Sequence, residues 1–251
     1  MSKSALSFSR FLVPCVCAAL ALLAVACTSP ARQNETASIS APSASVMPFD
    51  AWQHYQLPGK QPTEFSFVHQ DGRLVAAAVA NASASMLRQP VRVEAADIGQ
   101  IQFSWMVPQL IEQADVGVRQ VDDSPVRVIL AFEGDRSTFS MKNAMLSELS
   151  HTITGEPLPY ATLMSVWCNK RAPDTVIINP RTDRIRTIVV ESGTQGLSHW
   201  LDYKRNIRAD FEKAFGEAPG PLVGLAIMTD TDNTQTKARA WFGPLQLTAV
   251  N

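Results

Sequence analysis

The segment Ile101-Gln102-Phe103-Ser104-Trp105-Met106-Val107 carries apolar residues at positions 101, 103, 105 and 107. Side chains alternate between the two faces of a β-strand, so this spacing predicts a strand with one continuous apolar face. The same alternation returns in the next strand candidate, at Val126, Val128, Leu130 and Phe132. Two consecutive segments of this kind indicate a sheet that packs one face against a core.

Short segments of similar character run through the rest of the chain, and Pro, Asn, Asp or Gly residues separate most of them. The further strand candidates are 65–68, 74–80, 91–95, 160–168, 175–178, 186–191, 222–228, 238–242 and 245–247. So many short strands predict an all-β, mainly antiparallel β-sandwich. Strands and helices do not alternate regularly, which disfavours a doubly wound parallel sheet.

One or two short helices interrupt the strands. Met141, Met145, Leu149 and Ile153 recur every four residues, Ser140 can cap the start, and Gly155 can end the segment. The second helix is expected over 207–215, where Ile207, Phe211 and Phe215 have the same spacing and Gly216 follows. The residues from 199 to 206 fit either an extension of this helix or a strand.

The composition is that of an ordinary globular protein, with 251 residues, 46% hydrophobic and 18% charged. The 22 Lys and Arg residues against 23 Asp and Glu leave a formal net charge of −1. The chain therefore lacks the basic surface that binding to a nucleic-acid backbone needs, and nucleic acid is not an expected partner. No internal repeat with a period of about 20 to 50 residues stands out, which disfavours solenoids and propellers.

The N-terminus has the three parts of an export signal. Lys3 and Arg10 make its first part basic, an apolar run follows over 11–26, and Ala24-Val25-Ala26 supplies the small residues of a cleavage site. The run contains Pro14 and is shorter than the roughly 20 apolar residues of a spanning helix. We therefore expect a cleaved signal peptide rather than a retained membrane anchor.

Leu23-Ala24-Val25-Ala26-Cys27 resembles the lipobox of bacterial lipoproteins, in which the cysteine thiol is acylated with diacylglycerol and becomes the new N-terminus. The resemblance implies that Cys27 is lipidated, although Ala24 stands where leucine is usual. Ala24-Val25-Ala26 also fits ordinary signal peptidase, so a soluble periplasmic protein is the alternative. Position 28 is Thr, whereas a sequence that resembles an inner-membrane retention signal would have an aspartate there. The expected location is therefore the outer membrane, facing the periplasm.

The cysteines fit this interpretation. Cys15 and Cys17 leave with the signal peptide and Cys27 would carry lipid, so Cys168 remains alone in the folded part. No intramolecular disulfide is expected. Because Cys168 ends an apolar stretch, we interpret it as a small buried hydrophobic residue rather than a nucleophile.

The chain after Cys27 begins with a polar stretch. From Thr28 to about Val46 it consists mainly of Ser, Ala, Thr, Gln, Asn and Pro, which cannot bury enough apolar surface to offset the entropy of ordering. We therefore predict a signal peptide over 1–26, a lipid-anchored flexible tether over 27–48, and a single β-sandwich domain over 49–251.

The common enzyme and metal motifs are missing from the sequence. It has no G-x-x-x-x-G-K-[ST], G-x-G-x-x-G, G-x-S-x-G or H-E-x-x-H. His54, His69, His151 and His199 are too dispersed to form a local metal-binding pattern. Most nucleotide-binding, hydrolase and zinc-peptidase classes are therefore disfavoured.

The segment Thr229-Asp230-Thr231-Asp232-Asn233-Thr234 follows one predicted strand and precedes the next. Its oxygen-bearing side chains could bind Ca²⁺, but the glycine and the distal glutamate of an EF-hand are missing. No metal or other cofactor is predicted, and Ca²⁺ is the one weak possibility. The other interpretation is a hairpin connection whose Asx side chains bond their own backbone. In either case Asp230, Asp232 and Asn233 could lie at a rim of the sandwich where ligands bind.

A second polar region consists of two loops, 169–174 and 179–184, that carry four basic and two acidic side chains. Asn179, Arg181 and Asp183 could bind a carboxylate or a sugar acid. The alternative is an ordinary solvated surface with internal ion pairs.

Four tryptophans are candidate platforms for a sugar ring, because the apolar face of a sugar stacks on an aromatic plane. We expect most of the four, which also include Trp167 and Trp200, to lie in the core. Trp105 in particular shares one strand face with Ile101 and Phe103. Trp241, beside the Asp-rich loop, is the best candidate for an exposed aromatic residue in the binding site.

Glycosidase chemistry would need two carboxylates on either side of the scissile bond. The residues eligible by type are Glu133, Asp135, Glu191, Asp230 and Asp232. The E-x-D-x-x-E strand pattern of sandwich-fold glucanases is absent, because the segment from Glu133 to Ser137 lacks the second glutamate. The sequence therefore assigns no catalytic residue.

Four long segments, 132–137, 159–167, 186–193 and 224–234, resemble the bacterial domain-of-unknown-function family numbered 3047 in the same order. The resemblance covers roughly 65–247 and implies no activity, because the family has no established catalytic residues. Many members end with a Tyr-Gly-Asp-Ile-like strand, where this chain has Pro244 in place of the aspartate. The strand-rich ending is also similar to carbohydrate-binding and concanavalin-like jelly rolls, a likeness of fold alone.

The predicted function is that of a cell-envelope lipoprotein whose β-sandwich is a non-catalytic binding module. A glycan or another small polar ligand is the expected partner, and the membrane is contacted through the lipid anchor only. One alternative is a sandwich-fold glycan hydrolase or lyase that uses a carboxylate pair. Another is a structural or accessory lipoprotein of an envelope assembly, with a protein partner that the sequence does not identify.

Overall fold

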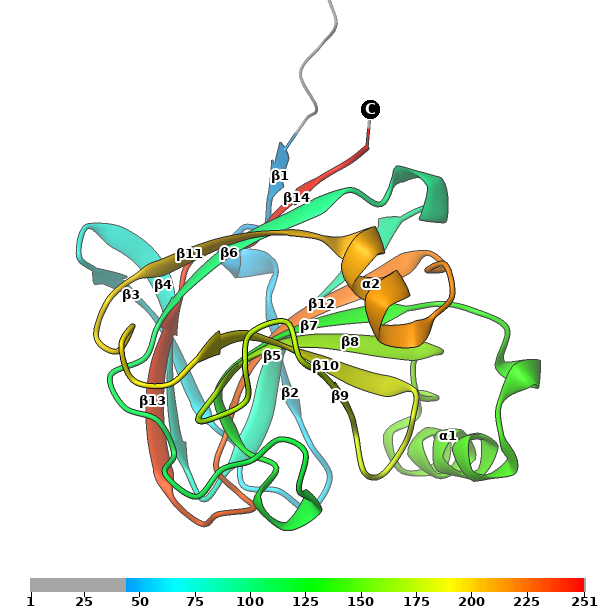
Figure 1. Ribbon diagram of the computed structural model, residues 1–251, viewed down its shortest axis with the longest axis horizontal. Helices are drawn as coiled ribbons and strands as arrows, with labels where there is room; N and C mark the ends of the chain where they lie inside the picture. Colours follow the sequence, from blue (N-terminus) through cyan, green and yellow to red (C-terminus); the bar gives the residue numbers. More distant parts are fainter. Residues whose placement is uncertain (1–43, 251) are drawn as a thin grey trace, which may run out of the picture. The chain divides into compact units, whose positions relative to one another are not determined.

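The alternating segments form two seven-stranded sheets in the computed structural model, which describes residues 44–250 (Figure 1). Sheet A contains β1 (Ala44–Val46), β3 (Glu64–Gln70), β4 (Arg73–Asn81), β6 (Gln100–Met106), β11 (Leu201–Asn206), β13 (Lys237–Phe242) and β14 (Gln246–Thr248). Its order is β1-β14-β6-β13-β4-β3, and β11 also pairs with β6. All of these pairs are antiparallel.

Sheet B contains β2 (Gln53–Gln56), β5 (Ala84–Val93), β7 (Ser124–Phe132), β8 (Ala161–Cys168), β9 (Val176–Ile178), β10 (Ile185–Ser192) and β12 (Leu222–Asp230). Its order is β2-β5-β12-β7-β8-β10-β9, and β8 with β10 is its parallel pair. The prediction of a mainly antiparallel β-sandwich with one or two short helices is therefore confirmed.

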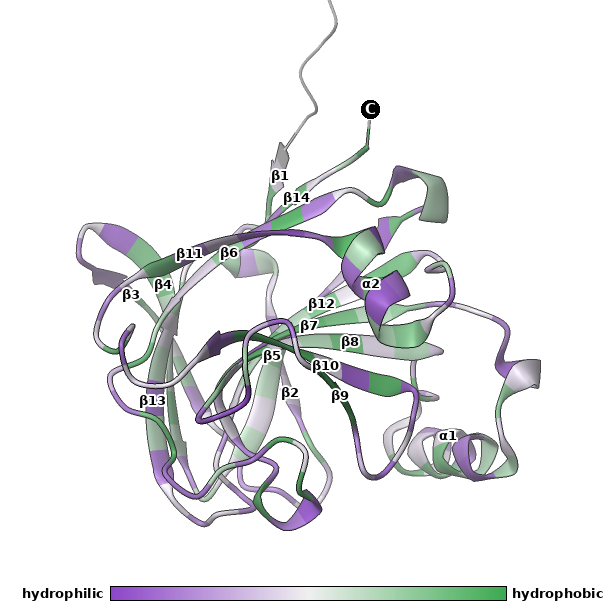
Figure 2. Cartoon of the chain, viewed as in Figure 1, coloured by the Kyte–Doolittle hydropathy of each residue, from purple (hydrophilic) through white to green (hydrophobic). Residues whose placement is uncertain are grey.

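The core lies between the inner faces of the two sheets. In β6, Ile101, Phe103 and Trp105 are buried there, as the alternation predicts. They meet inward residues of sheet B such as Phe132 and Leu225, which are also buried. Figure 2 shows the central strands β7 and β12 mostly in the hydrophobic colour. Burial of this face supplies the main driving force for folding.

Helix α2 (Ile207–Phe215) packs its apolar side against this core. Ile207, Phe211 and Ala214 are buried, and the Phe211 ring lies 4.6 Å from that of Phe132. Asn206 caps the start through its side chain, and Gly216 ends the helix with a φ of 71°, which glycine adopts at little cost.

Helix α1 (Met141–Thr154) begins at the Ser140 cap and ends at Gly155, as predicted. Its polar side faces the body, where Asn143 and Ser147 are buried. Its apolar stripe is exposed instead, with relative exposures of 82% for Met141, 68% for Met145, 55% for Leu149 and 58% for Ile153. The four-residue spacing thus predicts the helix correctly, but it does not mark the side that packs against the sandwich.

Three strands show where the pattern was incomplete or ambiguous. β1, at the C-terminal end of the predicted tether, pairs with β14 from Ala44↔Thr248 to Val46↔Gln246. β2 is a short polar edge strand whose residues are mostly exposed, so it has no apolar alternation to reveal it. The segment that fitted either helix or strand forms β11 up to Asn206. The predicted signal peptide, Cys27 and most of the predicted tether lie outside the described residues.

Four 3-10 turns complete the secondary structure within 44–250, at Phe49–Ala51, Ala95–Asp97, Arg119–Val121 and Arg136–Thr138. In the same part of the chain, no helix combines the length and the apolar character needed to span a bilayer.

Candidate functional site

The Asp230 carboxylate is buried at the end of β12 and pairs with a buried arginine from β7. Arg127 Nε donates to Asp230 Oδ1 at 2.9 Å, and its Nη2 donates to Oδ2 at 3.0 Å. The backbone N–H of Ser124 donates to the same Oδ1 at 3.0 Å. These contacts satisfy both carboxylate oxygens inside the protein.

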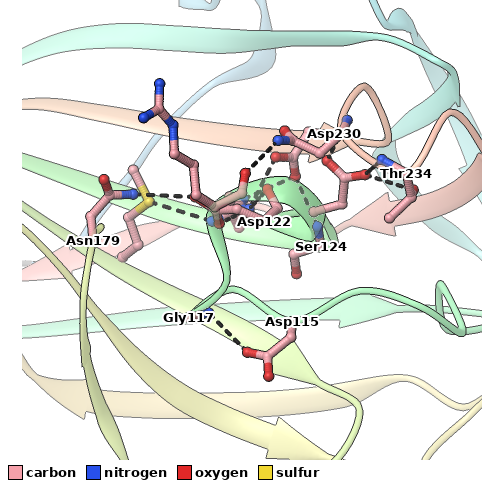
Figure 3. A network of polar contacts seen from close by, with 12 residues as sticks. Asp115, Gly117, Asp122, Ser124, Asn179, Asp230 and Thr234 are labelled. Atoms are coloured by element: carbon pink, nitrogen blue, oxygen red, sulfur yellow. Dashed lines mark hydrogen bonds and ion pairs between the residues drawn. The ribbon is translucent and has the colours of Figure 1, made fainter. Parts of the chain in front are cut away.

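Asp122 joins this pair to the loop between β9 and β10, as Figure 3 shows. Arg127 Nη2 donates to Asp122 Oδ1 at 3.1 Å. Asp122 Oδ2 accepts from Asn179 Nδ2 at 3.3 Å and from Arg181 Nη1 at 3.2 Å. The loops that carry Asp230 and Asn179 are therefore joined through Asp122 and Arg127.

Asp123 holds the loop after β12. Its carboxylate accepts from the Asn233 N–H at 3.2 Å, the Thr234 N–H at 2.7 Å and the Thr234 hydroxyl at 2.6 Å. The side chain of Asn233 donates to the carbonyl of Arg119 at 2.8 Å. This polar end, formed by residues 119–127, 179–181 and 230–234, is an internal hydrogen-bond network.

The carboxylates of Asp123, Asp230 and Asp232 lie within 4.8 Å of one another, a spacing at which a cation could be held. Each of them already has protein donors, and Lys60 forms an ion pair with Asp232. A Ca²⁺ ion would have to displace Lys60 and compete with Arg127 for the same oxygens. The donor set therefore fits a closed ion-pair network better than a calcium site.

Burial raises the pKa of Asp230 to about 6. Arg127 opposes this shift, while the neighbouring carboxylates of Asp123 and Asp122 add to it. Arg127 thus pairs with two buried carboxylates, Asp230 and Asp122, and the nearby buried Asp123 adds negative charge that favours a proton on Asp230. Burial alone would lower the pKa of Arg127, but Asp230 and Asp122 raise it, so this side chain stays charged.

The expectation that Asp230 is offered to a ligand at an exposed rim is wrong, because the residue is only 4% exposed. Asp183 does not join the polar end either, since it accepts from Asn143 of α1 at 2.6 Å. Trp241 lies in sheet A, whereas Asp230 lies in sheet B. The structure thus links Asp230, Asn233, Asn179 and Arg181, and separates Asp183 and Trp241 from them.

Sequence reasoning did not single out Asp122, Asp123 or Arg127, which organise the polar end. One signal was present, because Arg127 stands between Val126 and Val128 in an otherwise apolar strand. A charge at such a position needs a buried partner. The partner could not be named in advance, because Asp230 lies 103 positions away in the sequence.

Trp241 projects from the outer face of sheet A. Its neighbours Ala240 and Phe242 point into the core and are fully buried, whereas Trp241 is half-buried. In register it lies beside Ala77 of β4 and Met106 of β6. The indole is thus partly exposed on the outer face of the sheet.

A shallow groove of about 390 Å³ lies on sheet A, and its lining includes Arg239 of β13, two residues before Trp241, but not Trp241 itself. Glu64, Val79 and Arg239 lie in register across β3, β4 and β13, and all three line it. The Arg239 guanidinium carbon is 5.4 Å from the centre of the Trp241 ring. The other exposed polar residues of the lining are Asn81, Gln109 and Lys237. We call this feature the sheet A groove.

The other three candidate tryptophans, and Cys168, make contacts within the protein that fit a structural role. Trp105 and Trp167 are buried in the core, as expected for most of the tryptophans. Trp200 donates through Nε1 to Asp71 at 3.0 Å. Cys168 is buried and burial raises the pKa of its thiol to about 11, which is contrary to what a nucleophile needs.

Comparison with known families gives one match. The model of the family described as "Protein of unknown function (DUF3047)" matches residues 50–246. No curated protein matches the chain.

Three solved structures show a distant likeness. The xylan-binding module CBM86 from Roseburia intestinalis is 9% identical with a TM-score of 0.32, and the alignment covers 83% of this chain and 96% of that one. The xyloglucanase domain of NopAA from Sinorhizobium fredii, solved with cellobiose, is 9% identical with a TM-score of 0.42 and coverages of 83% and 98%. The K1 cleaved adhesin domain of Lys-gingipain from Porphyromonas gingivalis is 10% identical with a TM-score of 0.34 and coverages of 84% and 99%. At these scores the likeness does not extend to function.

Proposed function

The chain belongs to the DUF3047 family of proteins of unknown function, and from this premise we propose that its sandwich is a non-catalytic module that binds a glycan in the sheet A groove. The observation that carries the proposal is the half-buried indole of Trp241 beside a groove with exposed polar side chains from neighbouring strands. A sugar ring has an apolar face and a rim of hydroxyl groups. An aromatic plane flanked by charged and amide side chains is complementary to both.

The groove offers donors and acceptors of both kinds. Arg239 and Lys237 on β13 can donate, Glu64 on β3 can accept, and Asn81 and Gln109 can do either. Paired strands hold the backbone of Glu64 and Arg239, so a ligand has to order only their side chains. A groove open along the sheet suits an extended saccharide better than a compact cofactor.

The hydrolase or lyase alternative has weaker support. It needs two accessible carboxylates on either side of a bond, one of them with a raised pKa. Asp230 has such a pKa, but its side chain is buried and lines neither of the two cavities described in this protein. In the sheet A groove Glu64 is the carboxylate of the lining. A single carboxylate in an open groove favours binding over turnover.

The proposal includes export and anchoring. We propose that the mature protein is a lipoprotein held at the outer membrane through Cys27 and faces the periplasm. The support is the sequence alone: the export signal, the lipobox-like Leu23-Ala24-Val25-Ala26-Cys27 and the polar stretch that follows. Such a build would place the sandwich within reach of envelope glycans.

A glycan array followed by isothermal titration calorimetry of the strongest hit tests the proposal. We expect Trp241→Ala to weaken binding about tenfold, as loss of a central aromatic contact does. The matched control is Tyr55→Ala, because Tyr55 is also half-buried on an outer strand and also lies under an arginine, with Arg88 4.1 Å from its ring centre. That variant should bind the glycan as the wild type does.

Two outcomes would contradict the proposal. Equal binding by Trp241→Ala and the wild type, with matching thermal melts, would place the ligand outside the sheet A groove. Release of new reducing ends from the bound glycan would replace the binding module with the enzyme alternative.

The accessory-lipoprotein alternative has one observation in its favour, the exposed apolar stripe of α1. Exposed apolar stripes of this kind occur at protein contact surfaces. It would be supported if the protein bound no glycan and if a photo-crosslinker at Leu149, but not one at Glu64, captured a single envelope protein in cells.

A further inference from the structure

Helix α1 carries two methionines, Met141 and Met145, on the side that faces solvent. Their relative exposures are 82% and 68%, and they are four positions apart, which places them one above the other on the same side of the helix. Figure 1 shows α1 at the edge of the molecule, away from the core between the sheets. The two side chains are therefore open to small solutes.

The other methionines of the described residues are shielded. Met47, Met106 and Met228 are each only 7% exposed. Met86 and Met164 are half-buried and pack against a small apolar cluster on sheet B. Because the rate at which a sulfur is oxidised rises with its exposure, this difference favours α1 as the place where an oxidant reacts first.

The thiol of Cys168 does not compete with these methionines. The residue is buried, and burial raises the pKa of its thiol to about 11, so the thiol is protonated at neutral pH. Peroxides react with a thiolate, not with a protonated thiol. Cys168 is the one cysteine within residues 44–250, so in this part of the chain the most accessible oxidisable sulfurs are those of α1.

The fold does not use the side of α1 that carries the two methionines. The opposite side is the buried one, through Asn143 and Ser147. Asn143 accepts from the Thr182 hydroxyl at 2.8 Å and donates to Asp183 at 2.6 Å. A polar group added to either methionine would meet water rather than the core, so it would carry no desolvation cost.

Oxidation would change the surface of α1 instead. The thioether sulfur attacks one oxygen of hydrogen peroxide, an S–O bond forms and the O–O bond breaks. The sulfur loses two electrons, and the hydroxide that leaves takes the proton of the new S–OH group and becomes water. The product is a polar sulfoxide. Two of the four residues of the exposed stripe, Met141, Met145, Leu149 and Ile153, would then be polar.

We propose that Met141 and Met145 form a peroxide-sensitive site, at which oxidation converts the exposed stripe of α1 from apolar to polar and leaves the sandwich folded. The change is reversible, because methionine sulfoxide reductases return both epimers of the sulfoxide to the thioether. No residue of α1 lines the sheet A groove, so the failure of either proposal leaves the other standing.

The test titrates the purified protein with hydrogen peroxide and follows oxygen uptake at each methionine by peptide mass mapping. We expect Met141 and Met145 to be oxidised several times faster than Met106 and Met228. The melting temperature should change by no more than about 2 °C, because the stripe makes no packing contact that oxidation could remove. The oxidised protein should elute earlier from a hydrophobic-interaction column, and treatment with both reductases should restore its elution.

The matched control is the double variant Met141→Leu and Met145→Leu, which keeps the stripe apolar. It should elute at the same position before and after treatment with peroxide. The proposal is overturned if Met106 or Met228 takes up oxygen as fast as the α1 pair, or if oxidation of that pair lowers the melting temperature by more than the stated limit. It is also overturned if peroxide shifts the elution of the wild type and of the double variant equally.

Discussion

The contacts of single residues explain why Asp230, which was predicted to bind a ligand at the rim of the sandwich, is buried instead. Asp230 was predicted as a surface ligand because it follows a strand in a polar segment, a position that usually lies in a loop. In the structure it is the last residue of β12 and pairs with Arg127 on the neighbouring strand β7. Its burial could not be predicted, because its partner Arg127 lies 103 positions away in the sequence.

Arg127→Ala tests whether the polar end is a structural network. Removing one member of a buried ion pair leaves an uncompensated charge, so we expect the free energy of unfolding to fall by about 3 to 5 kcal/mol. The control is Arg88→Ala, whose pair with Glu156 is much more exposed and should cost about 1 kcal/mol or less. Urea denaturation measures both, and a similar small loss in the two variants would contradict this account.

Asp230 should also give the stability a pH dependence. Its pKa in the folded protein is about 6, above the roughly 3.9 expected in the unfolded chain. The folded state then binds more protons between these values, so the contribution is fully present below about pH 4 and is lost as the pH rises through about 6. We expect the wild type to lose about 1 kcal/mol between pH 5 and pH 7 from this group.

Asp230→Asn provides the comparison, because it removes this one carboxylate and leaves the rest of the chain unchanged. The difference in melting temperature between the wild type and this variant should shrink or reverse from pH 5 to pH 7. A difference that stays constant over this range would show that Asp230 is ionised throughout.

At the scale of elements, period-2 alternation predicted most of the strands that have one buried face, but it placed β5 at 91–95, whereas the strand is Ala84–Val93. It missed β2 because this edge strand is mostly exposed and has no apolar face that would show as alternation in the sequence. It left β11 ambiguous because the residues of this strand alternate between half-buried and exposed rather than between buried and exposed. The sheet A groove was not predicted either. It depends on the register of β3, β4 and β13, which places Glu64 and Arg239 on either side of Val79 although they are far apart in the sequence.

The α1 helix gives a prediction at this scale. Because Met145 and Leu149 are exposed, replacing both with Glu should change the melting temperature by no more than about 2 °C. Asn143→Ala should cost more, since it removes bonds to Thr182 at 2.8 Å and Asp183 at 2.6 Å from the buried side of the helix. Thermal melts of the two variants decide the matter, and a large loss in the double Glu variant would mean that the stripe is covered in solution.

For the whole molecule, the sequence alone supports an anchored and exported protein. Cys27→Ser should move the mature protein from the detergent phase to the aqueous phase in Triton X-114 partitioning, because the acylated cysteine would supply the apolar anchor. Cys168→Ser is the matched control and should partition like the wild type, since this thiol is buried in the sandwich. Aqueous partitioning of the wild type itself would leave the soluble periplasmic alternative.

The central claim is that a glycan lies on the sheet A groove beside Trp241, and NMR titration of the ¹⁵N-labelled protein with the strongest glycan from the array tests it most directly. We predict the largest shifts for the Trp241 indole N–H and for the backbone amides of Glu64 and of residues 237–241. Shifts confined to the polar end, at residues 119–127, 179–181 and 230–234, would contradict the claim and return the ligand to the loops.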